Sequence, residues 1–537
     1  MEKTSTAIRA LTANRLLAAI GLTTLVLLSL AFGLAWVSAG FDNTTSWSSF
    51  FGVLVIAVGL LWLSWKAIQS DKQLSVPGWL GWLLVGAALF RLVAGMIWFV
   101  VLPRWGYASP IEQNGYVMSD AATRDQGAWR LSQSEKPLWT AFQDYPQYDQ
   151  YGGLLYVSAL VYRYLGGGTH NSLLIVVLTA ACSALSVLFT WAFVRRLWNE
   201  RTAAIAAWLV ALFPEAVLLG SSHMREAFIT TLVAAAFYGL VRFWQDRSWQ
   251  GIAWVLAALV LTMPFSPAFT AILLVMLLIL GLAFDKGKLL HSRWLWVAMA
   301  CLAVAVVVGL WLSWRRFAPE GVSDPVSLIS WWLQQTARWQ AVFVRKASEM
   351  IRRVLNVTPE WSHPFILVGV GVAQPFLPAA LVDRAAPIWR GIAIWRAMGW
   401  TILLPLLIVA PLAALSRKNR RAILVVLSLL VWWGILLASF RSGGDLWDNP
   451  RYRVTFLAPQ AAMAAWVLSE QWRKPDPWLR RVIIVFLFVL GWFLPWYLAR
   501  YTGFDWPEVG VFKTLGLGLA SAVLYLIWDW IRRVEGL

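Results

Sequence analysis

Residues 77–103 read PGWLGWLLVGAALFRLVAGMIWFVVLP, an apolar run long enough to cross a lipid bilayer as a helix. A polar segment of roughly 65 residues follows it, and loops of that length are usually functional. Within this segment, residues 118–129 read MSDAATRDQGAW, which contains two carboxylates, Asp120 and Asp125. We therefore predict that these carboxylates lie a short way beyond the end of a hydrophobic helix, where the membrane meets water.

The composition of the whole chain fits this local pattern. Of its 537 residues, 60% are hydrophobic and 13% are charged, whereas soluble proteins carry about 25% charged residues. About 14 apolar runs approach the length of a membrane-crossing helix, near 14–39, 48–65, 77–103, 172–194, 202–219, 226–243, 250–264, 267–284, 294–314, 396–415, 422–440, 454–470, 482–499 and 511–531. The sequence predicts an all-α polytopic membrane protein.

Positive charge sets the expected orientation of these spans. The short alternate connections, such as 195–201, 417–421 and 473–481, are rich in Lys and Arg. The positive-inside rule places them, and both termini, on the cytoplasmic face of the plasma membrane. Two long loops, 104–171 and 315–395, then lie on the extracytoplasmic face.

The second long loop holds two segments of interest. Residues 327–355 form a basic amphipathic pattern, which we expect to lie on the membrane; attachment to headgroups and binding of a donor phosphate both remain open. Residues 364–382 are apolar and interrupted by two prolines. We expect a re-entrant or buried segment there, because a full span would upset the alternation of charge.

The formal net charge of +18 bears on the choice of partners. In a membrane protein, anionic lipid and a phosphate-bearing substrate are better candidates than nucleic acid. The two cysteines show no metal-ligand or redox spacing, so neither a disulfide framework nor a zinc site is implied. Many of the 38 tryptophans stand at the ends of apolar runs, which is typical of an interfacial belt.

Asp120 is the first candidate for chemistry. Ser119 is a plausible N-cap, which puts Asp120 in the first turn of a helix, and Arg124 lies one turn further on. One interpretation is a capped, ion-paired surface helix. The other is a carboxylate that takes a proton from an acceptor hydroxyl or amine.

Three further polar groups are candidates for substrate binding. Tyr148 and Tyr151 can face a sugar ring or anchor the chain at the interface. The short turn between two spans holds three more candidates: His223, Arg225 and Glu226. Arg225 and Glu226 either line an active site or form an ion pair that fixes the helix ends.

The last group, Arg451, Tyr452 and Arg453, precedes an apolar run. Its guanidinium groups suit phosphate or headgroup contacts. Arg91, in the middle of an apolar run, needs a partner inside the protein.

A family resemblance connects these features. The chain from Phe90-Arg91-Leu92 through Pro103 to Ser119-Asp120 and Ala128-Trp129 resembles the start of the GT-C membrane glycosyltransferases. It is most similar to the branch that contains the protein O-mannosyltransferases and the aminoarabinose transferases of lipid A. The segment at Tyr145-Pro146, the Arg225-Glu226 pair and Arg451-Tyr452 resemble later motifs of that family. Ala121 stands where the family often has a second acid.

The resemblance implies an inverting glycosyltransferase with Asp120 as catalytic base and a polyprenyl-phosphate sugar as donor. Asp125 and Arg124 would then line the substrate site. It also implies three parts: two additional N-terminal helices (1–75), a catalytic core (76–470) and C-terminal helices (471–537). The acceptor, whether protein, lipid or glycan, stays open.

The sequence leaves other functions and a metal cofactor open. A transporter or flippase for a lipid-linked or anionic substrate is the alternative, and a ligase that joins finished glycans is a third reading. A divalent ion is compatible with Asp120 and Glu226, but the sequence does not require one.

Overall fold

The computed structural model describes residues 21–38, 47–284, 324, 326–327, 330–331, 349–416, 422–443, 445–446, 448–473 and 477–534. Every regular element in these ranges is a helix, which confirms the all-α prediction for the part described. The chain forms two compact units: Met1–Asp71, Val76–Leu185 and Gly220–Arg225 make the first, and Lys72–Ser75, Ser186–Leu219 and Glu226–Leu537 make the second. The predicted division at residues 75 and 470 rests on resemblance and stays a prediction.

The described helices account for most of the predicted spans. Ten are long and apolar enough to cross a membrane, or up to 11 if the bent pair Glu200–Leu212 and Pro214–Gly220 is one span. Of the other expected runs, 250–264 is a shorter apolar helix and 454–470 a helix of 17 residues. The run 294–314 lies outside the described residues. The protein is a multi-pass membrane protein.

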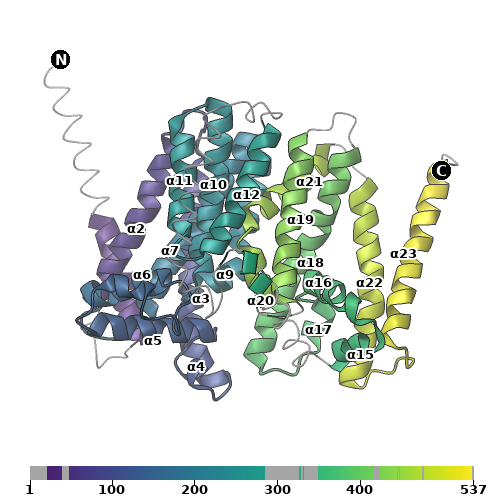
Figure 1. Cartoon of the computed structure of the whole chain (residues 1–537), viewed down its shortest axis with the longest axis horizontal. Coiled ribbons are helices and arrows are strands. Elements are labelled where there is room, and N and C mark those ends of the chain that lie inside the picture. Colours follow the sequence, from purple (N-terminus) through teal and green to yellow (C-terminus); the bar gives the residue numbers. More distant parts are fainter. Residues whose placement is uncertain are drawn as a thin grey trace. The chain divides into compact units, whose positions relative to one another are not determined.

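The first unit combines long helices with short ones. Its helices are Gly21–Ser38, α2 (Trp47–Gln69), α3 (Gly78–Trp105), α4 (Pro110–Gln113), α5 (Ser119–Gln133), η2 (Leu138–Phe142), α6 (Gly153–Leu165) and the first half of α7 (Leu173–Leu197). Figure 1 shows α5 and α6 lying across the direction of α3 near one of its ends. The loop 104–171 is therefore a packed layer rather than a simple connector.

The pattern of buried residues explains why α5 packs where it does. Ala121, Ala122, Ala128 and Leu131 are buried and recur at helical spacing, so one face of α5 lies against α6. The helix begins one residue earlier than predicted: Met118 is its N-cap and Ser119 its first residue. Asp120 lies in the first turn, as predicted, where a negative charge is favourable.

Inside α3, Arg91 has the internal partners that its position requires. Its side chain is fully buried, and it donates to Ser183 Oγ (2.9 Å) on α7 and to the carbonyl oxygen of Ala87 (3.0 Å). A buried guanidinium without such partners would be costly in lipid or protein. The predicted need for an internal partner is confirmed.

Gly95 marks a close approach of α3 to its neighbours, and we expect Gly95→Ala to destabilise the first unit. A Cβ there would come within 2.5 Å of Val176 Cγ1 and 2.9 Å of the Ser221 carbonyl oxygen. Overpacking of this kind costs about 1–3 kcal/mol. Thermal unfolding in detergent measures the loss.

The matched control is Gly86→Ala in the same helix, where nothing lies within 4 Å of the added carbon. It should be neutral or stabilising by up to about 1 kcal/mol. Equal shifts in Tm for both variants would show that the close approach does not constrain Gly95.

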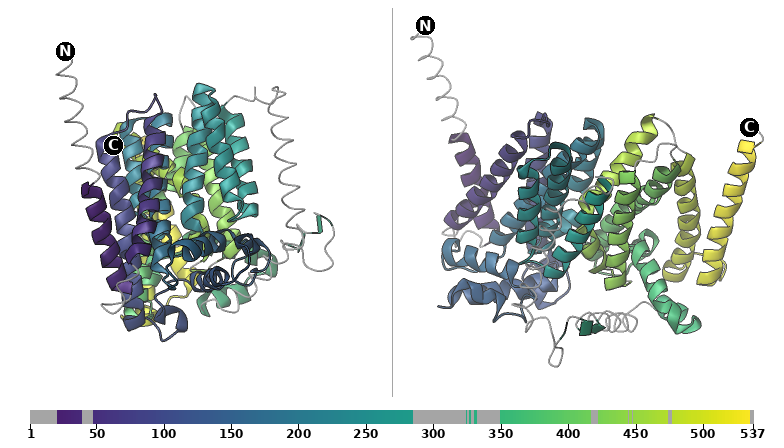
Figure 2. Two further views of the ribbon diagram at one scale, coloured as in Figure 1. Left: turned by 90° about the vertical axis from the view of Figure 1, so that its left-hand side faces the viewer. Right: turned by 45° about the horizontal axis from the view of Figure 1, so that its top comes forward.

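The second unit consists of packed helices. They are α8 (Glu200–Leu212), α9 (Pro214–Gly220), α10 (Glu226–Asp246), α11 (Trp249–Thr262), α12 (Pro267–Phe284), α15 (Glu349–Val357), η4 (Glu360–Ser362), α16 (His363–Ala373), α17 (Leu377–Leu381), α18 (Pro387–Ser416), α19 (Ala422–Ser442), α20 (Asp448–Val454), α21 (Leu457–Arg473), α22 (Pro477–Thr502) and α23 (Val511–Val534). The last two lie side by side in Figures 1 and 2.

The second long loop forms short helices where it is described. Residues 364–382 form two short helices, α16 and α17, instead of a full span. Of the basic segment 327–355, a continuous helix is described only in its last turns, within α15. There Ile351 and Leu355 pack against Leu367, whereas Arg352 is exposed, so this end is amphipathic. Arg338, Arg345 and Lys346 lie outside the described residues.

Candidate active site

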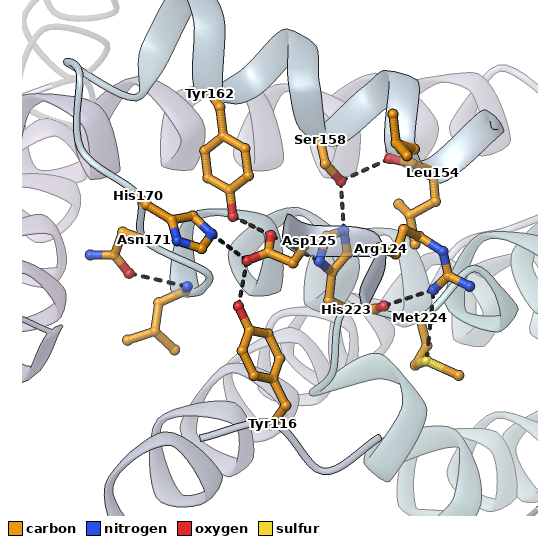
Figure 3. Close-up of polar contacts among 12 residues, drawn as sticks. Tyr116, Arg124, Asp125, Leu154, Ser158, Tyr162, His170, Asn171, His223 and Met224 are labelled. Carbon is orange, nitrogen blue, oxygen red and sulfur yellow. Dashed lines mark hydrogen bonds and ion pairs between the residues drawn. The ribbon is translucent and has the colours of Figure 1, made fainter. Parts of the chain in front are cut away.

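Asp125 is the centre of a buried polar cluster in the first unit (Figure 3). Its carboxylate has no exposed surface. Its Oδ1 accepts a hydrogen bond from the Tyr162 hydroxyl and lies 3.1 Å from Nδ1 of His223. Its Oδ2 accepts a hydrogen bond from the Tyr116 hydroxyl and lies 2.6 Å from Nε2 of His170. Four groups thus face the four lone-pair positions of one carboxylate.

The surroundings of Asp125 favour its ionised form. Burial alone would raise the pKa of this carboxyl, but the hydrogen bonds from His170 and His223 counteract it, and the pKa lies below its ordinary range. Burial raises the pKa of Tyr116 and Tyr162, and the neighbouring carboxylate raises both further. Both phenols therefore keep their protons and act as donors to Asp125.

His223 links this cluster to α6. Its Nε2 lies 2.6 Å from Oγ of Ser158, and that hydroxyl also donates to the carbonyl oxygen of Leu154 (2.8 Å). Ser158, His223 and Asp125 therefore form a continuous chain of polar contacts. Ser158 and His223 are at most 1% exposed. A nucleophile must reach its substrate, so this arrangement orients side chains rather than attacking a substrate.

His170 is the partially exposed member of the cluster. Its side chain is 34% exposed, and its ring stacks on Trp129 with centroids 5.2 Å apart. The chain reaches this place through Gly167 and Gly168, whose φ angles of 58° and 80° lie in the left-handed region that favours glycine. This glycine stretch turns the chain so that His170 faces Asp125.

The cluster makes stability depend on pH, and we expect the protein to lose stability as the pH falls below about 4. The pKa of Asp125 is lower in the folded state than in the unfolded chain. Its ionisation therefore stabilises the fold above the unfolded pKa, and this contribution disappears on further acidification.

Thermal unfolding from pH 7 to pH 3 checks the expectation. The Tm difference between wild type and Asp125→Asn should shrink towards the acid end, and a constant difference would contradict it.

The remaining candidates in the first unit lie on α5, in the segment before α6 and in the turn before α10. Asp120 is exposed on the first turn of α5. Arg124 is buried and contacts Asp149 (3.4 Å) and the carbonyl oxygen of His223 (3.2 Å). Arg225 lies over the ring of Tyr151, with its guanidinium carbon 4.9 Å from the centroid. The hydroxyl of Tyr148 accepts a hydrogen bond from Arg130, whose guanidinium also lies over its ring.

Four candidates belong to the second unit and contact other residues there: Glu226, Arg451, Tyr452 and Arg453. Nε of Arg451 lies 3.3 Å from Glu226, and its guanidinium lies over the ring of Tyr452. The guanidinium of Arg453 lies over Trp400, at 3.3 Å, and donates to the carbonyl oxygen of Gln374 at 2.8 Å. In this structure, protein groups therefore contact Arg451 and Arg453.

Several residues of the Asp125 cluster escaped the sequence analysis. Tyr116, Ser158, Tyr162 and His170 lie 9 to 65 positions from their partners, so no local pattern joins them to Asp125 or His223. One signal was present. The chain has four histidines, and two of them contact one aspartate. In a chain with so few histidines, two that lie near the ends of apolar runs indicate a polar site there.

The part of the chain that the structure describes contains no preformed set of metal ligands. No group of three or more His, Cys, Asp or Glu side chains there could hold a metal ion. In the Asp125 cluster the histidine nitrogens face the carboxylate oxygens directly, instead of converging on a common point. We derive no step through a metal.

The fold and the Asp125 cluster together define the class of this protein. It is a helical multi-pass membrane protein whose first long loop presents one exposed and one buried carboxylate on a single helix. Residues 154–314 match the family model described as dolichyl-phosphate-mannose-protein mannosyltransferase. The match supports the predicted resemblance to the GT-C membrane glycosyltransferases over these residues.

A solved structure is also similar to this chain. It is the archaeal oligosaccharyltransferase AglB from Archaeoglobus fulgidus, in complex with an inhibitory peptide and a dolichol-phosphate. The identity is 17% and the TM-score 0.41, and the similarity covers 83% of this chain. The chain spans about half the length of that protein, 54%. No curated protein matches the chain.

Proposed function

We propose that the protein transfers a sugar from a polyprenyl-phosphate carrier to an acceptor on the extracytoplasmic face of the plasma membrane, with inversion at the anomeric carbon. The match to a dolichyl-phosphate-mannose transferase model supports a lipid-phosphate donor. The positive-inside pattern supports cytoplasmic termini and an outward-facing loop 104–171. The basic charge of the chain suits both anionic lipid and a phosphate leaving group.

One observation carries the assignment of the base. Asp120 and Asp125 lie on the same helix but differ in access: Asp120 is exposed, whereas Asp125 is fully buried and faced by four polar groups. A general base must come within hydrogen-bond reach of the proton that it takes. A substrate can approach the exposed carboxylate of Asp120, whereas the buried carboxylate of Asp125 is enclosed by its four neighbours.

The proposed reaction is a single displacement. Asp120 accepts the proton of the acceptor hydroxyl or amine while that oxygen or nitrogen attacks the anomeric carbon. The bond between this carbon and the phosphate oxygen breaks on the opposite face, and the polyprenyl phosphate leaves with the bonding electrons. The configuration therefore inverts. No covalent enzyme intermediate is needed, and the chain supplies position, charge and one proton acceptor.

Arg225 is the cation in the first unit that we assign to the leaving phosphate. It is half-buried beside Tyr151, and a guanidinium suits bidentate contact with phosphate. Stabilising the charge that develops on the leaving group contributes to the rate. To bind the donor phosphate, Arg451 and Arg453 must exchange the contacts that they make with protein groups for contacts with the donor.

The experiment that tests the function is transfer of labelled sugar by purified protein in lipid vesicles. Polyprenyl-phosphate hexoses and pentoses serve as donors, and membrane extracts, peptides and glycans serve as acceptors. We expect release of polyprenyl phosphate together with a new glycosidic bond of inverted configuration. Movement of a lipid-linked substrate across the vesicle without any transfer would overturn the proposal in favour of a transporter.

A further inference from the structure

An open cavity of about 330 Å³ lies beside the Asp125 cluster, within the first unit. Its described lining includes the amides of Gln113, Asn114 and Asn171, together with Tyr116 and His170. None of the described lining residues is Lys, Arg, Asp or Glu. The cavity is therefore polar but carries little formal charge, which suits a neutral ligand with many hydroxyl groups better than an anion.

Two of these amides are already oriented by the main chain. Asn114 donates through Nδ2 to the carbonyl oxygen of Pro110 (2.7 Å), and Asn171 accepts at Oδ1 from the backbone N–H of Leu173 (3.2 Å). These bonds assign the oxygen and nitrogen ends of each amide. Asn114 is left with an acceptor oxygen for a ligand, and Asn171 is left with an amide donor.

His170 adds a second acceptor to the wall of the cavity. Because Asp125 is ionised, the Nε2 of His170 that lies 2.6 Å from it carries the proton. In the neutral ring the remaining nitrogen, Nδ1, then has a lone pair. Asp125 thus fixes the tautomer as well as the orientation, and the partially exposed ring can accept a hydrogen bond from a ligand hydroxyl.

We propose that this cavity binds a saccharide ring, the neutral glycan part of the acceptor. This inference adds a substrate class to the proposed function. It rests on that function, because the saccharide is an acceptor only if the protein transfers a sugar. A sugar hydroxyl both donates and accepts, so one hydroxyl can donate to His170 while another accepts from Asn171. Phe99 and Pro103 line the same cavity and offer apolar surface to the C–H face of a sugar. Asp120 is not among the lining residues, so binding and proton transfer are separate tasks.

Direct binding tests the inference without any need for transfer. Purified full-length protein in lipid nanodiscs is titrated with the methyl glycosides of mannose, glucose and N-acetylglucosamine, and saturation-transfer NMR reports contact and affinity. The 6-phosphates of the same sugars are the anionic comparison. We expect at least one neutral glycoside to bind, and its phosphate to bind more weakly.

Two conservative variants separate binding from folding. His170→Gln keeps an N–H donor towards Asp125 and removes the Nδ1 acceptor. Asn171→Asp keeps the oxygen that accepts from Leu173 and removes the amide donor. Each should weaken binding about tenfold, the loss expected for one hydrogen bond, with an unchanged Tm. His363→Gln, in the second unit, is the matched control and should bind like wild type.

Several outcomes would overturn the inference. They are binding of none of the glycosides, preference for the phosphorylated sugars, or equal affinity in both cavity variants and the control. Its failure can be told from failure of the proposed function. Sugar transfer without glycoside binding removes only the cavity assignment, whereas glycoside binding without transfer from any donor keeps the cavity and removes the transferase.

Discussion

Asp120→Asn should lower the rate of sugar transfer about 10²–10⁴-fold, the range that a positioned general base contributes. Asparagine keeps the size and shape of the side chain but cannot accept the proton of the acceptor. The residue is exposed in the first turn of α5, so the substitution disturbs little packing. Single-turnover transfer from a labelled polyprenyl-phosphate sugar measures the effect, and binding of the donor should stay near that of wild type.

The control for this prediction is Asp144→Asn in the same loop. Asp144 is exposed and pairs with Lys136 at 2.8 Å, away from the Asp125 cluster, so transfer should be unchanged. Loss of activity in Asp120→Asn should be greatest where the acceptor is least acidic, because such acceptors depend most on a base. Full activity in Asp120→Asn would show that another group takes the proton and would return Glu226 and Asp125 to consideration.

Asp125→Asn should destabilise the protein by about 3–5 kcal/mol, the cost of removing one partner from a buried charged network. The substitution removes the negative charge between His170 and His223. It also places an N–H₂ group where two donors already point, so hydrogen bonds are lost within a fully buried site. Thermal or denaturant unfolding in detergent measures this effect, and activity falls only because less protein is folded.

Asp144→Asn again supplies the comparison, now for stability. Its pair with Lys136 has side chains that are 42% and 56% exposed, and exposed pairs contribute about 0–1 kcal/mol. The same Asp→Asn change should therefore cost much stability at position 125 and little at position 144, although both positions lie in one loop. If Asp125→Asn were as stable as wild type but inactive, the buried cluster would have a direct part in the reaction, and the roles of the two aspartates would have to be exchanged.

Much of the fold could be predicted from the sequence because membrane spans depend on local properties. An apolar run of sufficient length must satisfy its own backbone hydrogen bonds in lipid, and a helix does so alone. The runs at 77–103 and 172–194 therefore appear as α3 and α7 within a few residues. Asp120 in a first turn and a partner for Arg91 also followed from local rules. The N-cap was wrong by one residue because helix ends are weakly determined.

The cluster around Asp125 could not be predicted in this way. Its members come from the segments 116–125, 158–170 and 223, which lie on different helices and turns. The sequence and the family resemblance favoured Asp120 as the base, but no local pattern shows which of the two acids is buried. Only packing distinguishes them: position 125 is on the buried face of α5 and position 120 on the exposed one.

What the sequence determined by itself is therefore the class of fold, a helical multi-pass membrane protein. The length and hydropathy of each apolar run settle this class because lipid imposes these requirements on each segment separately. The tertiary structure alone decided which carboxylate is accessible, which histidines face it and where a polar cavity opens. Those features bring together residues that lie far apart in the chain, and no local pattern encodes such contacts.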